Sequence, residues 1–362
     1  MIRAASVPLL ARQNAAPQVA PTPHTRLNES TPASKRRRRG SRSELDPILG
    51  QIIDGEFVID RPIGSGSHAD VFLARQRSVG DRPIALKVLC RPYLSLREPD
   101  FRRAVIALLR EGKLLGALHA PCFIDIIRTG VLDDGRPYIA MEYAHGPNLA
   151  DVMDEKKDLG LTVIRDILLQ LGEGLAELHG MGYVHRDITP ANLLLTHANE
   201  TTTRVRMVDF GTVTKISGRP DRYRVGYDLD HPLGTPAYMA PEQATGGVVD
   251  GRADQFAVAG IVYEALTGRR VISQSEPGAR GMLMSLRADT PLPEARLSQL
   301  RTDLPSGVAD VIDTALRRQP EDRHPDMDTF VRAFRAAVDG DPIRSGRRRS
   351  GLLGRLLGRE GT

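Results

Sequence analysis

The stretch Tyr183-Val-His-Arg-Asp-Ile-Thr-Pro-Ala-Asn192 places a carboxylate, Asp187, five positions before an amide, Asn192. Apolar runs on either side predict a helix through Gly174–Leu178 and a short strand over Leu193–Leu195. A loop between those two elements can hold both side chains, and a carboxylate with an amide can handle a proton and a metal ion. The triplet His-Arg-Asp also occurs in unrelated proteins, so its interpretation depends on what the rest of the chain supplies.

The composition is that of an ordinary soluble globular protein, because 41% of the 362 residues are hydrophobic and 26% are charged. The length accommodates two or three compact units. The two cysteines, Cys90 and Cys122, are too few for a disulfide framework and match no metal-binding pattern, which favours a reducing compartment and a cytoplasmic location. No apolar run approaches the roughly 18 residues of a membrane span, and the N-terminus lacks a secretory core. A transit peptide stays open, since no acidic residue precedes Glu29.

The positive charge is concentrated near the two ends of the chain. The formal net charge is +5, and the basic runs are Lys35–Arg39 and Arg347–Arg349. Without these runs the remainder is close to neutral, so the middle of the chain offers no convincing nucleic-acid site. Residues 1–50 have no sustained apolar period and are predicted to be a disordered basic arm. Its basic run is interpreted either as a solvated charge run or as a signal for the nucleus or for an acidic partner.

Residues 339–362 are predicted to form a basic tail. Four of its leucines would share one face of a helix: Leu352, Leu353, Leu356 and Leu357. Such a face can rest weakly on an anionic membrane surface or dock on a partner, although three glycines lower the helicity of the segment. A frayed tail is the alternative, and both interpretations stay open.

Between the arm and the tail, the chain divides into a strand-rich part and a helical part. Short apolar runs punctuated by Gly and Pro predict strands up to residue 143, with one helical period among them, and after Gly146 the period is helical. We therefore predict an α+β fold with a small β-rich lobe over 51–143 and a larger, mostly helical lobe over 144–338. The predicted strands are Phe57–Ile59, Ala69–Arg75, Pro83–Leu89, Ile124–Val131 and Pro137–Tyr143, and the predicted helices are Phe101–Leu118, Leu161–His179, Asp254–Thr267, Gly307–Arg318 and Met327–Val338.

A glycine-rich stretch, Gly64-Ser-Gly-Ser-His-Ala-Asp-Val71, lies between the first two of these strands. Glycines let a backbone pass close to phosphate oxygens and aim its amide hydrogens at them. Its place between two strands, rather than before a helix, argues against a dinucleotide-binding fold. A plain hairpin turn is the alternative.

Three further charged residues supply what a phosphate site needs. Lys87 lies in an apolar strand, where its charge needs a partner, and Glu111 on the following helix is the natural counterion. A lone lysine on an edge strand is the alternative. Asp209-Phe-Gly211 follows the strand Arg204–Val208, and a carboxylate at a strand end suits a hard cation such as Mg²⁺, with Asn192 as a second oxygen ligand.

Taken in order, these motifs resemble those of the eukaryotic-type protein kinases, and the resemblance covers roughly residues 55–338. The segment Gly234-Thr-Pro-Ala-Tyr-Met-Ala-Pro-Glu242 resembles the serine/threonine class, and the composition resembles bacterial members. The resemblance implies a two-lobed kinase fold with an ATP site. Carried over position by position, that site comprises Gly64, Ser65, Gly66, Ser67, His68, Ala69, Val71, Ala85, Lys87, Glu111, the gatekeeper Met141, the hinge residues Glu142 and Ala144, and Leu194.

The resemblance also implies how these residues act. The γ-phosphoryl group of ATP passes to a serine or threonine hydroxyl of a protein, this chain included. Asp187 matches the catalytic aspartate, and Lys87 matches the lysine that contacts the α- and β-phosphates. Asn192 and Asp209 match the ligands of Mg²⁺, for which Mn²⁺ is the substitute.

Further matches concern the frame of the site and its control. Arg323 is placed like the arginine that pairs with Glu242, and Asp254 resembles the aspartate that braces the catalytic loop. Arg186 beside Asp187 suggests control by a phosphate on the activation segment, while a segment ordered without modification is the alternative. The available hydroxyls are those of Thr212, Thr214, Ser217, Tyr223, Tyr227 and Thr235.

One residue departs from the pattern. Serine/threonine kinases usually carry a lysine two positions after the catalytic aspartate, where this chain has Thr189. The departure supports a first alternative, a pseudokinase that binds nucleotide as a scaffold without transferring phosphate. A second alternative is a small-molecule kinase of related fold, although such enzymes generally lack the Ala240-Pro-Glu242 segment and its arginine partner.

Overall fold

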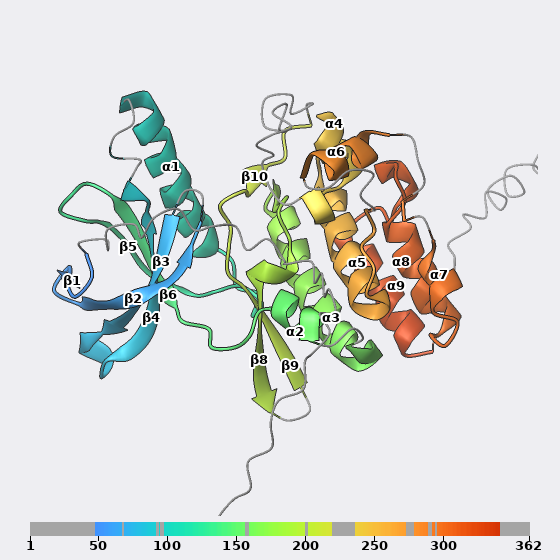
Figure 1. Ribbon diagram of the computed structural model, residues 1–362, viewed down its shortest axis with the longest axis horizontal. Coiled ribbons are helices and arrows are strands. Elements are labelled where there is room, and N and C mark those ends of the chain that lie inside the picture. Colours follow the sequence, from blue (N-terminus) through green and yellow to red (C-terminus); the bar gives the residue numbers. More distant parts are fainter. Residues whose placement is uncertain are drawn as a thin grey trace, which may run out of the picture. The chain divides into compact units, whose positions relative to one another are not determined.

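The computed structural model describes residues 48–66, 69–91, 94, 98–155, 159–199, 202–218, 236–272, 279–288, 292–293 and 295–340. The predicted arm and tail lie outside the described residues, apart from residues 48–50 and 339–340, and stay predictions. The described part forms a strand-rich lobe and a larger helical lobe (Figure 1), in agreement with the predicted α+β architecture.

The strand-rich lobe is a six-stranded antiparallel sheet with the strand order β1-β2-β3-β4-β6-β5. Side chains alternate between its two faces, as a strand requires: Tyr138 and Ala140 pack on one face, and Ile139 packs on the other. The shortest strand, β1, escaped prediction because two residues are too few to show a period. The strands are β1 (Ile52–Ile53), β2 (Phe57–Ser65), β3 (Ala69–Gln76), β4 (Arg82–Leu89), β5 (Ile126–Val131) and β6 (Pro137–Glu142).

Helix α1 (Glu98–Leu115) covers one face of this sheet, where Leu108 packs with Leu89 of β4 and Ile139 of β6. It ends three residues before the predicted Leu118. Gly116 still bonds to Gly112, at 3.0 Å, but the Ala117 amide then turns to the carbonyl three residues back, that of Leu114, at 2.9 Å. A glycine at the end of a helix favours such a stop.

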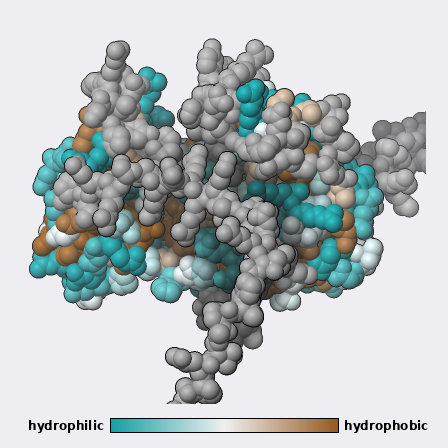
Figure 2. Space-filling model, viewed as in Figure 1, coloured by the Kyte–Doolittle hydropathy of each residue, from teal (hydrophilic) through white to brown (hydrophobic). Residues whose placement is uncertain are grey.

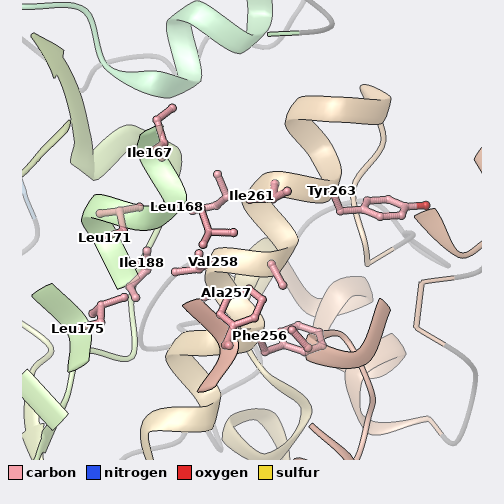
Figure 3. Packing of buried hydrophobic residues seen from close by; sticks show 14 of the residues in the cluster. Ile167, Leu168, Leu171, Leu175, Ile188, Phe256, Ala257, Val258, Ile261 and Tyr263 are labelled. Carbon is pink, nitrogen blue, oxygen red and sulfur yellow. The ribbon is translucent and has the colours of Figure 1, made fainter. Parts of the chain in front are cut away.

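The helical lobe is built around α3 and α5, which pack side by side (Figure 3). Helix α5 is buried on almost all sides, so its apolar residues show no single stripe. Two short pairs of strands complete the lobe, β7 with β10 and β8 with β9. The elements are α2 (Leu149–Glu155), α3 (Gly160–Gly180), β7 (Tyr183–Val184), β8 (Leu193–Asn199), β9 (Thr202–Met207), β10 (Thr214–Lys215), α4 (Pro241–Thr245), α5 (Gly251–Thr267), α6 (Ala279–Arg287), α7 (Leu297–Leu300), α8 (Ser306–Ala315) and α9 (Met327–Val338).

The core of this lobe also holds the loop after β7. Ile188 is 1% exposed and points between α3 and α5, toward Leu171, Leu175 and Val258 (Figure 3). Burying an aliphatic side chain of this size contributes about 1.5–3 kcal/mol. Ile188 therefore anchors the neighbouring Asp187 to the two central helices.

The described surface on the face shown in Figure 2 is mostly hydrophilic, with hydrophobic patches over the strand-rich lobe. Among the described residues, no helix is both long enough and apolar enough to cross a membrane.

Candidate active site

Three charged side chains from distant parts of the chain meet where the two lobes join. The ammonium of Lys87, on β4, lies 2.6 Å from Glu111 Oε1, on α1, and 2.9 Å from Asp209 Oδ1, just after β9. Glu111 Oε1 also accepts a hydrogen bond of 3.3 Å from the Phe210 amide. One ammonium thus joins the sheet, its covering helix and the helical lobe.

Two carboxylates compete for this one ammonium, and their surroundings decide how they share it. Burial acts to lower the pKa of Lys87, but Glu111 and Asp209 outweigh it and hold that pKa above its ordinary value. Burial raises the pKa of Glu111, and together with the charge of Asp209 it outweighs the opposing effect of Lys87. Burial also acts to raise the pKa of Asp209, yet Lys87 outweighs it and the pKa of Asp209 is lowered. Burial therefore disfavours the charged form of Glu111, whereas the ammonium of Lys87 favours the charged form of Asp209.

The two predicted metal ligands are tied together through the backbone. The Asn192 carbonyl accepts a 3.1 Å hydrogen bond from the amide of Val208, the residue before Asp209. The Asn192 side-chain amide donates to the Asp187 carbonyl at 3.4 Å, which leaves Oδ1 as the free end of that side chain. In the described part of the chain, neither Asn192 Oδ1 nor Asp209 Oδ2 has a hydrogen-bond partner.

An apolar cluster lies on the same side of the sheet as Lys87. It contains five of the residues predicted to bind the nucleotide: Val71, Ala85, Met141, Ala144 and Leu194. Within the described residues, the Ala144 amide has no hydrogen-bond partner, as expected for a group that would donate to an adenine ring. Sequence reasoning missed the other members of the cluster: Ile124, Ile126, Tyr143 and Val208. An apolar residue that lines a ligand site has the same sequence pattern as one that fills a core, so no signal distinguished them.

The glycine-rich stretch is the hairpin between β2 and β3. The Gly66 amide donates to the Ala69 carbonyl at 2.9 Å, and Gly64 pairs with Val71 across the two strands. Ser65 Oγ donates to Asp70 Oδ1 at 2.8 Å, which ties the two arms of the hairpin together. Ser67 and His68, the predicted residues at its tip, lie outside the described residues.

Asp254, at the start of α5, holds the backbone of the loop that carries Asp187. Its carboxylate is fully buried and accepts hydrogen bonds of 2.8 Å from the His185 amide, the Arg186 amide and His179 Nε2. Burial acts to raise the pKa of Asp254, but the contact with His179 and these amides outweigh it and lower the pKa. The predicted bracing by Asp254 is therefore present, and His179 is a partner that sequence reasoning missed.

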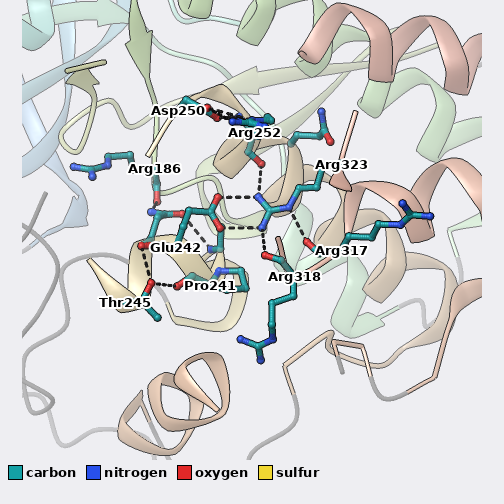
Figure 4. A network of polar contacts seen from close by, with 12 residues as sticks. Arg186, Pro241, Glu242, Thr245, Asp250, Arg252, Arg317, Arg318 and Arg323 are labelled. Atoms are coloured by element: carbon teal, nitrogen blue, oxygen red, sulfur yellow. Dashed lines mark hydrogen bonds and ion pairs between the residues drawn. The ribbon is translucent and has the colours of Figure 1, made fainter. Parts of the chain in front are cut away.

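Glu242, in α4, forms a two-pronged ion pair with Arg323 (Figure 4), as its position suggested. The two hydrogen bonds are both 2.8 Å long. The guanidinium also donates to the carbonyls of Arg252, Arg317 and Arg318, and it lies 4.9 Å from the centre of the Phe256 ring. Every N–H of Arg323 has a hydrogen-bond partner, so this ion pair fixes α4 to the neighbouring parts of the helical lobe.

Thr189, the residue that departs from the kinase pattern, is 4% exposed. The Thr189 carbonyl accepts a hydrogen bond of 3.0 Å from the backbone amide of Asn192. This hydrogen bond closes the turn that carries Asn192. Of the predicted phosphorylation sites, Thr212 donates to the His185 carbonyl at 2.9 Å and Thr214 to the Thr212 carbonyl at 3.0 Å. Tyr223, Tyr227 and Thr235 lie outside the described residues.

The family model of the protein kinase domain matches residues 57–332, and the chain belongs to this family. Among known proteins, the chain is 31% identical to serine/threonine-protein kinase pkn3 of Myxococcus xanthus over 83% of its length. It is 31% identical to the probable serine/threonine-protein kinase PknB of Corynebacterium glutamicum over 75%, and 29% identical to PrkC of Bacillus subtilis over 82%.

The chain spans only part of each of these curated relatives. It covers 54% of pkn3, 41% of PknB and 42% of PrkC. The predicted resemblance to bacterial members of the family is confirmed, and the relatives carry further sequence beyond the part that this chain matches.

Proposed function

We propose that this chain is an ATP-dependent protein kinase that phosphorylates serine and threonine hydroxyls of proteins, its own among them. The observation that carries the proposal is the meeting of Lys87, Glu111 and Asp209, with contacts of 2.6 and 2.9 Å. An ammonium held between two carboxylates has no evident need in a core, whereas phosphate oxygens require such a group at a fixed place. The serine/threonine-kinase names of the bacterial relatives support the same activity.

Each predicted residue then has a role. Asp187 orients the substrate hydroxyl and takes its proton, and Ile188 and Asp254 keep its loop in place. Lys87 holds the α- and β-phosphates, and the backbone of the β2–β3 hairpin covers them. The adenine ring stacks within the apolar cluster and meets the backbone of Glu142 and Ala144.

The donors near the phosphate position fit a hard divalent cation. Asn192 Oδ1 and Asp209 Oδ2 are oxygen donors with no hydrogen-bond partner in the described part of the chain, and oxygen is the ligand that Mg²⁺ prefers. We propose Mg²⁺, with Mn²⁺ as its substitute, held by these two side chains together with ATP. When bound, the cation offsets charge on the phosphates.

The partners that follow are ATP and protein substrates, and the site of action is the cytoplasm, where ATP is abundant. No nucleic acid is proposed as a partner, because the sequence between the two basic runs is close to neutral. Contact of the basic tail with a membrane surface stays a prediction, because the tail lies outside the described residues.

Phosphopeptide mapping of the wild type and of Asp187→Asn, after incubation with Mg²⁺ and ATP, tests the proposal. We expect wild-type phosphate on serine and threonine, and a loss of about 10²–10⁴-fold in the variant with nucleotide binding retained. Full transfer by the variant would contradict the role of Asp187. A wild type that binds nucleotide but transfers nothing would favour the scaffold alternative.

A further inference from the structure

We infer that Gln243 is a positioning residue for Asp187, a role that rests on the proposed kinase function. Gln243 lies in α4, directly after Glu242, and its side chain is buried. It is 56 positions from Asp187, and nothing in the sequence pattern singled it out. The contacts of its single amide group carry the inference.

The two ends of this amide bind two different segments. Its oxygen accepts a hydrogen bond of 3.1 Å from the Ala240 amide and so caps the first turn of α4. Its nitrogen donates a hydrogen bond of 2.9 Å to the Arg186 carbonyl, in the loop that carries the catalytic aspartate. A neutral group that accepts on one side and donates on the other meets both requirements, and an ionised carboxylate of the same size meets only the first.

The carbonyl that Gln243 binds belongs to a strained residue. Arg186 has a φ of 74°, in the left-handed region, where a residue other than glycine costs about 1–3 kcal/mol. Asp254 holds the amide of Arg186 at 2.8 Å, and Gln243 holds its carbonyl at 2.9 Å. With both ends of the residue bound, the strained conformation is maintained.

This carbonyl belongs to the peptide group that links Arg186 to Asp187. Because a peptide group is planar, a bond that fixes the carbonyl also fixes the amide of Asp187 and the direction in which its chain leaves. Gln243 therefore sets the orientation of the catalytic carboxylate without touching the substrate. A misplacement of about 1 Å can cost on the order of 10²-fold in rate.

The same residue joins the catalytic loop to the buried ion pair. In Figure 4, Arg186 lies on one side of Glu242 and Arg323 on the other. Arg323 binds Glu242 at 2.8 Å and so fixes the position of α4. Gln243, the next residue in α4, donates to the Arg186 carbonyl and so links the position of α4 to that of the catalytic loop. The orientation of Asp187 thus depends on the correct seating of α4.

Two substitutions separate the two bonds. Gln243→Leu removes both, whereas Gln243→Glu keeps the acceptor for Ala240 and loses the donor to Arg186 while its carboxyl is ionised. We expect kcat to fall about tenfold in both variants at pH 8, with KM for ATP changed by less than about twofold. Because position 243 is buried, the pKa of the introduced carboxyl is expected to lie above its ordinary value, and its protonation restores a donor. The ratio of kcat between Gln243→Glu and the wild type should therefore rise as pH falls from 8 to 5, while that of Gln243→Leu stays flat.

Gln255 provides a matched control, because it is a buried glutamine in α5 that donates to the carbonyls of His324 and Asp326, away from the catalytic loop. We expect Gln255→Leu to lower stability and to leave kcat within about twofold of the wild type. Equal losses of kcat in Gln243→Leu and Gln255→Leu, or a pH-independent ratio for Gln243→Glu, would overturn the inference.

Hydrogen exchange of the peptide 184–192 gives a readout that needs no kinase activity. We expect its amides to exchange at least about tenfold faster in Gln243→Leu than in the wild type or in Gln255→Leu. Unchanged exchange in Gln243→Leu would overturn the positioning role even if the chain transfers phosphate. Faster exchange in a chain that transfers nothing would uphold the contact and reject the proposed function instead.

Discussion

Arg323 in the helical lobe and Lys87 in the strand-rich lobe are both buried cations, but their surroundings differ. The guanidinium of Arg323 uses all five N–H groups, two on Glu242 and three on backbone carbonyls, at distances of 2.8–3.0 Å. The ammonium of Lys87 has two carboxylate partners, and the Asp209 side chain is 46% exposed. One cation completes a closed network, and the other ends in a group that solvent and ligands can reach.

The different surroundings of Arg323 and Lys87 indicate a structural role for the first cation and a role in the chemistry of the site for the second. A buried polar network whose members are all satisfied makes a region rigid, and any loss leaves unpaired groups behind. A cation with partners on both lobes and an exposed carboxylate can exchange contacts when phosphate or a metal ion arrives. We therefore expect substitutions in the closed network to cost stability, and substitutions around Lys87 to cost activity at smaller cost in stability.

The largest effect on stability is expected for Arg323→Leu. Removing the guanidinium leaves the buried carboxylate of Glu242 and three backbone carbonyls without this hydrogen-bond partner. The free energy of unfolding should therefore fall by about 3–5 kcal/mol. Urea unfolding at low temperature measures the loss. The double variant Arg323→Leu with Glu242→Leu should recover part of the lost stability, because no charge is then left unpaired. A loss below about 1 kcal/mol in Arg323→Leu alone would show that the network is not closed.

A smaller effect is expected for Asp254→Asn, of about 1–3 kcal/mol near neutral pH, since hydrogen bonds to a charged acceptor become bonds to a neutral one. The folded-state pKa of Asp254 lies below its ordinary value of about 3.9, so below about pH 4 the unfolded state binds more protons and the wild type loses this contribution as pH falls. The difference in the free energy of unfolding between the wild type and Asp254→Asn should therefore become smaller as pH falls below about 4. Urea titrations between pH 3 and pH 7 check this, and a constant difference would contradict it.

Lys87→Met should destabilise the protein by only about 1–2 kcal/mol, because Asp209 can be solvated and Glu111 can bind a proton. Burial already raises the pKa of Glu111, and loss of the ammonium raises it further. The folded variant then binds more protons than the unfolded chain above about pH 4.3, so its stability should increase as pH falls from 8 to 5. Phosphoryl transfer by Lys87→Met should be lost at every pH. A destabilisation as large as that of Arg323→Leu would contradict the proposed difference between the two cations.

The smallest effect is expected for Arg335→Ala. Its ion pair with Glu173 measures 2.6 Å, but the two side chains are 48% and 61% exposed, so solvent competes for both. The free energy of unfolding should change by less than about 0.5 kcal/mol. A larger change by the same urea assay would mean that distance, rather than burial, decides the value of these ion pairs.

Much of the fold could be predicted where a period was long enough to be seen. Helix α9 was predicted to the residue at Met327–Val338, because its buried residues repeat at helical spacing between an Asp326 cap and a polar end. The helix over Gly307–Arg318 was predicted three residues too long, since Pro320 allows helix up to Arg318 but the chain already leaves it after Ala315. Strand β1 and the short helices α2, α4, α6 and α7 show too little pattern to be predicted.

The sequence by itself determined the family and the charged residues of the candidate site, because each kinase motif is local and its order along the chain is visible. It also indicated that Lys87 needs a partner, since a charge in an apolar strand is costly alone. Only the tertiary structure decided that Glu111 and Asp209 share that one ammonium, and that Gln243 holds the Arg186 carbonyl. Such contacts join segments far apart in the chain, and the spacing of residues carries no information about which distant atoms the packing of two lobes brings within 3 Å.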